Sequence, residues 1–200
     1  MKSPVEFHFD FTSPYSYLAS ELIEALAARH DRGVDYRPTL LGAAFKLSGQ
    51  RPLVDIPMKG EYSRRDLARC ARFYGIPFQI PEPFPVSTVT AARSCLLLQR
   101  ENPALAVPFI HAVFRAYFTQ GRNIAEADVV HAVLTEAGAD AAKVLEAAGL
   151  PANKEALKQV VDASIARGVF GAPFFFVDDE PFWGCDRLPQ LERWLATGGF

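Results

Sequence analysis

Two serines spaced three residues apart could bind a sulfur anion. They open and close the turn Ser13-Pro14-Tyr15-Ser16. Serine is a preferred helix N-cap and proline suits the first helical position, so the hydroxyls are expected where a helix begins. Backbone N–H groups and the positive end of the helix dipole favour an anion there. A hydroxyl can donate a hydrogen bond to a thiolate without being oxidised, which lowers the thiol pKa.

The segments on either side must position this turn. Apolar and polar residues alternate from Val5 to Thr12, the pattern of a half-buried strand. After the turn, apolar residues recur at helical spacing as far as His30. Residues 34–38 have the composition of a second strand. A strand, a helix and a strand at this spacing predict a right-handed unit with parallel strands.

The rest of the chain divides into helical and extended segments. Residues 39–57 and the proline-rich residues 76–85 are predicted to lack regular structure. Strand periodicity returns at residues 171–177, with a turn at 178–179, a returning strand at 180–184 and a final helix from 186. Helices, most of them ended by glycine, are predicted over 59–74, 88–100, 106–120, 126–137, 141–148 and 151–167.

The composition is that of a globular protein. Half of the 200 residues are apolar and the formal net charge is −2, which argues against nucleic acid as the main partner. No stretch reaches the ~20 apolar residues of a membrane span, and no signal peptide is recognised. Three widely spaced cysteines favour a reducing compartment, and no histidines and cysteines have metal-ligand spacing. A cytoplasmic, metal-free protein is expected.

Four short motifs in the chain resemble one known family. They are residues 9–19, 57–62, 171–173 and 182–188. Together they are similar to the 2-hydroxychromene-2-carboxylate isomerases, which are close to kappa-class glutathione transferases within the DsbA-like thioredoxin superfamily. The resemblance implies an α/β thioredoxin-like fold with a large all-helical insertion. It places the thioredoxin-like domain at residues 1–56 and 165–200, and the inserted helical domain at residues 57–164.

The resemblance assigns roles to the residues nearest the turn. Ser13 is the catalytic residue and faces the sulfur of bound glutathione. Pro173 follows a cis peptide bond, and the N–H and C=O of Ala172 pair with the glutathione backbone as an added strand would. The plainer interpretations are a helix cap at Ser13 and an ordinary proline at a strand start. A disulfide oxidoreductase is excluded, because Ser13 and Ser16 occupy the cysteine positions of the redox members.

Further residues are assigned to the ends of glutathione and to the organic substrate. Asp186 holds the γ-glutamyl end, with Cys185 beside it as a backbone contact. Lys59 reaches the glycyl carboxylate of glutathione or the acidic substrate. Gln50 and Ser87 stand where the family often carries asparagines, so they are expected to contact the substrate. A surface lysine and a plain helix-capping aspartate are the commoner fates of such residues.

The implied activity is a glutathione-dependent isomerisation. Glutathione acts as a cofactor, and its thiolate adds reversibly to 2-hydroxychromene-2-carboxylate or a close aromatic analogue, giving trans-o-hydroxybenzylidenepyruvate. This is a step in the degradation of aromatic compounds, and family members are commonly dimers. Two alternatives stay open: a kappa-like glutathione transferase that consumes glutathione, and a non-catalytic thioredoxin-like protein that binds peptides.

The histidines are expected to be structural. His8 alternates onto the polar face of the first strand. The other three, His30, His111 and His131, fall on helices with no partner evident from the sequence. No Ser-His-Asp arrangement is evident that would make Ser13 a nucleophile.

Overall fold

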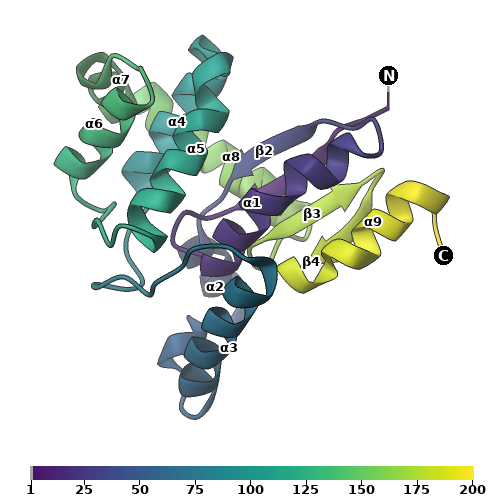
Figure 1. Ribbon diagram of the computed structural model, residues 1–200. Helices are drawn as coiled ribbons and strands as arrows, with labels where there is room; N and C mark the ends of the chain where they lie inside the picture. Colours follow the sequence, from purple (N-terminus) through teal and green to yellow (C-terminus); the bar gives the residue numbers. More distant parts are fainter. Residues whose placement is uncertain (1) are drawn as a thin grey trace.

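A four-stranded mixed sheet lies at the centre of the computed structural model, which describes residues 2–200 (Figure 1). The strand order is β2-β1-β3-β4. β1 is parallel to β2 and antiparallel to β3, and β3 and β4 form an antiparallel hairpin. The predicted parallel pair and terminal hairpin are therefore confirmed. The strands are β1 (Val5–Phe9), β2 (Val34–Pro38), β3 (Phe174–Val177) and β4 (Glu180–Trp183).

The hairpin turn follows from its two residues. Asp178 and Asp179 both have positive φ, at 50° and 76°. Two consecutive positive φ angles define the type I′ turn that suits the twist of a two-residue hairpin, and aspartate tolerates this conformation. The predicted turn at 178–179 is confirmed.

The helices agree with the predicted segments to within a few residues, with one exception. Residues 39–57, predicted to be irregular, contain a helix and a 3-10 turn. The helical elements are α1 (Pro14–Ala28), α2 (Leu41–Ser48), η1 (Leu53–Asp55), α3 (Lys59–Tyr74), α4 (Val89–Glu101), α5 (Pro103–Phe118), α6 (Ala127–Glu136), α7 (Ala141–Gly149), α8 (Pro151–Ala166), η2 (Cys185–Arg187) and α9 (Leu188–Thr197).

Helices cover both faces of the sheet. α1 and α9 lie side by side on one face (Figure 1). On this face, alternation along β1 directs Phe7 and Phe9 inward, and both are fully buried. The Phe114 ring of α5 lies 5.7 Å from the Phe9 ring and 5.1 Å from the Phe11 ring, centroid to centroid. This aromatic core fixes the end of β1 from which the serine turn emerges.

The helices between α2 and α8 form the rest of the molecule. α3 packs on α1 and η1, while α5 packs on both α1 and α4. α6 and α7 lie at the end of the molecule farthest from β4 and α9 (Figure 1). The α/β thioredoxin-like fold with a large helical insertion is confirmed. The domain limits at residues 56 and 165 stay a prediction, since α8 contacts both β2 and α4.

Within residues 2–200, no helix is both long and apolar enough to cross a bilayer.

Candidate functional site

The serine turn has the predicted capping geometry. Ser13 is the N-cap of α1, with an extended backbone at φ −86° and ψ 113°, and Pro14 is the first helical residue. The Ser16 N–H donates to the Ser13 Oγ at 3.2 Å. Ser13 is only 4% exposed, so its hydroxyl lies at a buried helix N-terminus. The dipole of α1 makes this position favourable for negative charge.

A second segment, distant in sequence, meets the turn. The Ser13 hydroxyl donates to the Ala172 carbonyl at 2.9 Å, across 159 residues. The Ala172–Pro173 bond is cis, as predicted. The structure thus brings Ser13, Ala172 and Pro173 together. Because a hydroxyl has one hydrogen, the Ser13 donor is already engaged in this structure.

A buried carboxylate lies directly behind the turn. Asp10 is 3% exposed and accepts from Thr12 N at 3.1 Å and Thr88 Oγ1 at 2.7 Å through Oδ1, and from Leu41 N at 2.7 Å through Oδ2. Burial raises the pKa of Asp10, although the three hydrogen bonds oppose the rise. We call Asp10, Thr12, Ser13 and Thr88 the turn cluster. The sequence analysis assigned no role to Asp10, although it belongs to the first motif.

The residues predicted to contact the organic substrate, and Lys59, predicted to reach a carboxylate, are all exposed. Ser87 is exposed between Val86, whose N–H donates to Thr12 Oγ1 at 3.1 Å, and Thr88. The exposed Gln50 follows α2, and the exposed Lys59 begins α3. Within residues 2–200, the structure shows no hydrogen bond or ion pair that joins these three side chains to Ser13. Their roles stay predictions.

Tyr15, in the first turn of α1, connects the turn to α3. Its hydroxyl donates to Asp66 Oδ2 at 2.9 Å, and Cys70 Sγ lies 3.7 Å from the same oxygen. Burial, the Asp66 hydrogen bond, and the neighbouring Asp66, Cys70 and Cys185 raise the pKa of Tyr15. This hydroxyl therefore stays protonated and acts as a donor.

The segment that follows β4 contains the other predicted glutathione residues. Cys185 is buried, and burial raises the pKa of its thiol to about 12. Such a thiol is mostly protonated at neutral pH and reacts slowly with oxidants. Asp186 is exposed, and its Oδ2 lies 3.4 Å from the Arg187 guanidinium. All three cysteines of the chain are free.

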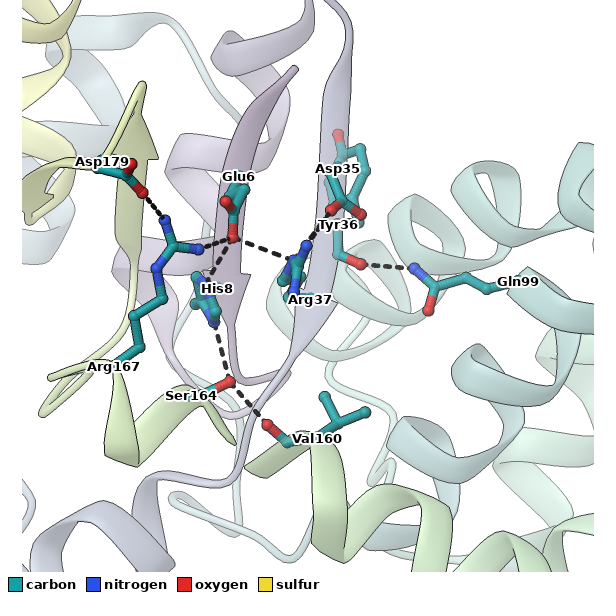
Figure 2. A network of polar contacts seen from close by, with 10 residues as sticks. All are labelled: Glu6, His8, Asp35, Tyr36, Arg37, Gln99, Val160, Ser164, Arg167 and Asp179. Atoms are coloured by element: carbon teal, nitrogen blue, oxygen red, sulfur yellow. Dashed lines mark hydrogen bonds and ion pairs between the residues drawn. The ribbon is translucent and has the colours of Figure 1, made fainter. Parts of the chain in front are cut away.

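The opposite face of β1 carries a different polar group, which Figure 2 shows. Arg37 lies 3.2 Å from Glu6, and Arg167 forms ion pairs with both Glu6 and Asp179. Burial raises the pKa of Glu6, but the Arg167 hydrogen bond and the arginine charges outweigh it and leave the pKa lowered. We call Glu6, His8, Arg37, Arg167 and Asp179 the outer-face network.

His8 lies on the polar face of β1, as predicted, but this face is covered at His8. It is 1% exposed, because α8 covers it, and its Nδ1 lies 3.0 Å from Ser164 Oγ. The Ser164 hydroxyl donates to the Val160 carbonyl, so His8 Nδ1 is the donor in this pair. Burial and the neighbouring Arg37 lower the pKa of His8 to about 4. His8 is therefore a neutral buried residue.

The expectation that His111 has no partner is wrong. His111 Nε2 lies 3.1 Å from Glu24 and Nδ1 lies 3.5 Å from Glu21. Both glutamates are on α1, and no local pattern in the sequence predicts that α1 and α5 meet at this position. Arg115 completes the group through an ion pair with Glu21 at 2.7 Å. His111 joins α5 to α1.

Comparison with known proteins agrees with this architecture. The DSBA-like thioredoxin domain family matches residues 4–196, and the chain belongs to that family. The 2-hydroxychromene-2-carboxylate isomerase of Sphingobium xenophagum is 31% identical over 98% of this chain and 99% of its own. Within the DSBA-like proteins, the chain is therefore a member of the 2-hydroxychromene-2-carboxylate isomerase family.

Two further similarities bear on the enzyme class. The solved structure of a 2-hydroxychromene-2-carboxylate isomerase superimposes with a TM-score of 0.86 at 30% identity, covering 97% of this chain and 94% of the other. Glutathione S-transferase kappa 2 of Caenorhabditis elegans is 26% identical over 96% of this chain and 91% of its own. The expectation of an enzyme of the isomerase class is confirmed.

Proposed function

We propose that this chain is a glutathione-dependent isomerase that interconverts 2-hydroxychromene-2-carboxylate and trans-o-hydroxybenzylidenepyruvate, or a close aromatic analogue. The supporting observation is the buried Ser13 hydroxyl at the N-terminus of α1, 2.9 Å from the Ala172 carbonyl. This pair offers a donor for a thiolate beside a backbone acceptor for a peptide. Relatives whose names specify this reaction and a glutathione transfer support the proposal.

The residues present fit glutathione, a tripeptide with a thiol, an ammonium group and two carboxylates. Ser13 and the α1 N-terminus suit the thiolate, and the partly exposed Ala172 offers its backbone to the peptide. The exposed Asp186 suits the γ-glutamyl ammonium, and the exposed Lys59 suits a carboxylate. Each end of the tripeptide thus has a group of opposite charge available in the proposed site.

The proposed mechanism is reversible covalent catalysis. Glutathione, when bound, would supply a thiolate for reversible addition to a conjugated carbon, which converts the double bond into a single bond that can rotate before the sulfur leaves. Ser13 turns its hydroxyl hydrogen from Ala172 toward the sulfur, while the Ser16 N–H keeps Oγ in place. The α1 dipole stabilises the anion. Gln50 and Ser87 are proposed to orient the substrate.

The setting of the enzyme is part of the same proposal. Three free cysteines fit a reducing compartment, so we place the protein in the cytoplasm. Its substrate would be a small aromatic carboxylate from the degradation of aromatic compounds. A homodimer and the domain limits at residues 56 and 165 complete the proposal.

The decisive experiment follows the ultraviolet spectrum of 2-hydroxychromene-2-carboxylate. Equilibration is expected only when enzyme and a catalytic amount of glutathione are both present, and the glutathione should be recovered unchanged. Equilibration without glutathione would refute the cofactor role. Ser13→Ala should lower kcat about 100-fold with an unchanged circular dichroism spectrum. Ser20→Ala is a matched control, because Ser20 is buried on the same helix and donates to the Tyr17 carbonyl.

A kappa-like transferase is the second candidate, favoured by the kappa relative. In that case glutathione would be consumed in equal amount with an electrophile such as chlorodinitrobenzene. A measurement of free thiol during turnover separates the two activities. A protein that binds no glutathione would instead fit the peptide-binding alternative.

A further inference from the structure

Asp10 is a buried acid to which the proposed mechanism assigns no role. Its side chain is almost inaccessible, and each oxygen accepts a backbone N–H, from Thr12 on Oδ1 and from Leu41 on Oδ2. An N–H group can only donate, so this arrangement favours the ionised carboxylate, which accepts at both oxygens. Within residues 2–200, no basic side chain forms an ion pair with Asp10.

The three donors that stabilise the Asp10 carboxylate in place of a cation come from three separate segments. Thr12 directly precedes the serine turn, Leu41 is the first residue of α2, and Thr88 directly precedes α4. Asp10 thus caps the N-terminus of α2 from outside that helix and holds the start of α4 through a hydroxyl. The favourable ends of two helix dipoles stabilise its charge.

These segments also carry the residues proposed to contact the organic substrate. Ser87 lies directly before Thr88, and Gln50 lies two residues after the end of α2. The Val86 N–H donates to Thr12 Oγ1 and fixes the same segment a second time. The contacts of Ser13 with Ser16 N and Ala172 O do not involve the Asp10 carboxylate. The carboxylate therefore holds the segments that carry Gln50 and Ser87, and not the Ser13 hydroxyl.

We propose that Asp10 is a positioning residue that sets the distance from the serine turn to the start of α2 and to residues 86–88. This inference rests on the proposed function. It assigns the Asp10 carboxylate to the organic substrate rather than to glutathione, because the Ser13 hydroxyl bonds to Ser16 and Ala172, and the Ser13 N–H donates to the backbone carbonyl of Asp10 rather than to its side chain. Loss of the carboxylate should therefore weaken the binding of the organic substrate and leave the binding of glutathione unchanged.

The test uses Asp10→Asn, which keeps one acceptor and places an amide NH2 against a donor. The KM for the chromene should rise about 10-fold, while the KM for glutathione stays within about twofold. Amide exchange at Leu41 should quicken at least about 10-fold. Asp140→Asn is the matched control, since Asp140 caps α7 through the Lys143 N–H, and α7 packs on α4, α6 and α8. It should leave both KM values unchanged.

A milder variant covers the case in which Asp10→Asn fails to fold. Thr88→Val removes one donor and keeps the carboxylate, so the KM for the chromene should rise about threefold with the glutathione KM unchanged. Equal changes in both KM values, or no change in either, would overturn the positioning role. If the wild-type protein does not isomerise the chromene, the proposed function fails. The positioning role then depends on amide exchange alone, and full protection of Leu41 in Asp10→Asn overturns it.

Discussion

Strand β1 carries one polar region on a face and leads into a second just after its end, and the two regions stabilise charge in opposite ways. In the outer-face network, Glu6 lies between Arg37 and Arg167, so every charge has a partner of opposite sign (Figure 2). In the turn cluster, the Asp10 carboxylate has backbone and hydroxyl donors but no cation within residues 2–200.

The difference indicates which region can serve chemistry. Paired charges on a partly exposed face mainly add stability, and salt screens them. The Asp10 carboxylate is held by backbone and hydroxyl donors from three segments, so it fixes those segments relative to the serine turn without a flexible cationic side chain. Helix N-termini also have fixed positions, so they can orient substrates more precisely than flexible arginines can.

The largest effect is expected from deleting the acid of the turn cluster. Asp10→Ala leaves the Thr12 and Leu41 N–H groups and the Thr88 hydroxyl without an acceptor. Unpaired buried groups cost about 1–3 kcal/mol each, part of which is regained because a buried charge disappears, so a net loss of about 3 kcal/mol in the free energy of unfolding is expected. Urea denaturation measures it. The value expected for Asp140→Ala is about 1 kcal/mol. A smaller loss for Asp10→Ala would contradict the claim that three buried donors depend on the Asp10 carboxylate.

A smaller effect is expected from pH, through His8. Its folded pKa of about 4 lies below the ordinary value, so in that interval the unfolded chain binds a proton that the folded chain does not. Stability should therefore fall as the pH drops from about 6.5 toward 4. His8→Asn keeps a donor for Ser164 and cannot titrate. Between about pH 7 and pH 4.5, the wild type should lose about 2 kcal/mol more than this variant.

His111 should change the stability with pH in the direction opposite to His8, so it serves as an internal control. Burial lowers its pKa, but the hydrogen bond to Glu21 and the Glu24 charge outweigh burial, and the net pKa is raised. Its stabilisation is present at low pH and is lost as the pH rises through the folded pKa. His111→Asn should steepen the acid loss that His8→Asn reduces. Parallel shifts in the two variants would contradict the assignment.

The smallest effect is expected within the outer-face network. Glu6→Gln removes the acid shared by Arg37 and Arg167 and should lower the free energy of unfolding by about 1 kcal/mol. About 0.5 M salt should shrink the difference, because it screens partly exposed pairs. Turnover should not change. A fall in turnover as large as that of Ser13→Ala would mean that the two polar regions are coupled.

Local signals made most of the fold predictable. Ser13 and Pro14 set the start of α1, and Gly75 ends α3 with a positive φ of 68°. The missed helix α2 also ends at a glycine, Gly49, with a positive φ of 69°, but it lacks a signal at its start, because its N-cap Leu40 has no polar side chain. Its capping group is Asp10, 31 residues earlier in the chain. A pattern search within one helix does not find a cap of that kind.

The candidate site was predictable to the same extent. Ser13, Ala172 and Pro173 meet because their motifs depend on the fold, which the sequence pattern indicates. Lys59 and Gln50 are exposed, and packing does not determine where an exposed side chain points. The buried state of His8 escaped prediction because its cover, α8, follows about 150 residues later.

The hydrogen bond from Ser13 to Ala172 has a consequence for the affinity of the site. Without a ligand, this hydroxyl and this carbonyl satisfy each other. The proposed peptide thiol would have to break that bond before it gains two new ones, so its binding would be an exchange that yields only about 1 kcal/mol net for each hydrogen bond formed. Weak net attraction would suit the proposed cofactor, which has to leave unchanged after each cycle. The bond between Ser13 and Ala172 would then form again as the cofactor leaves.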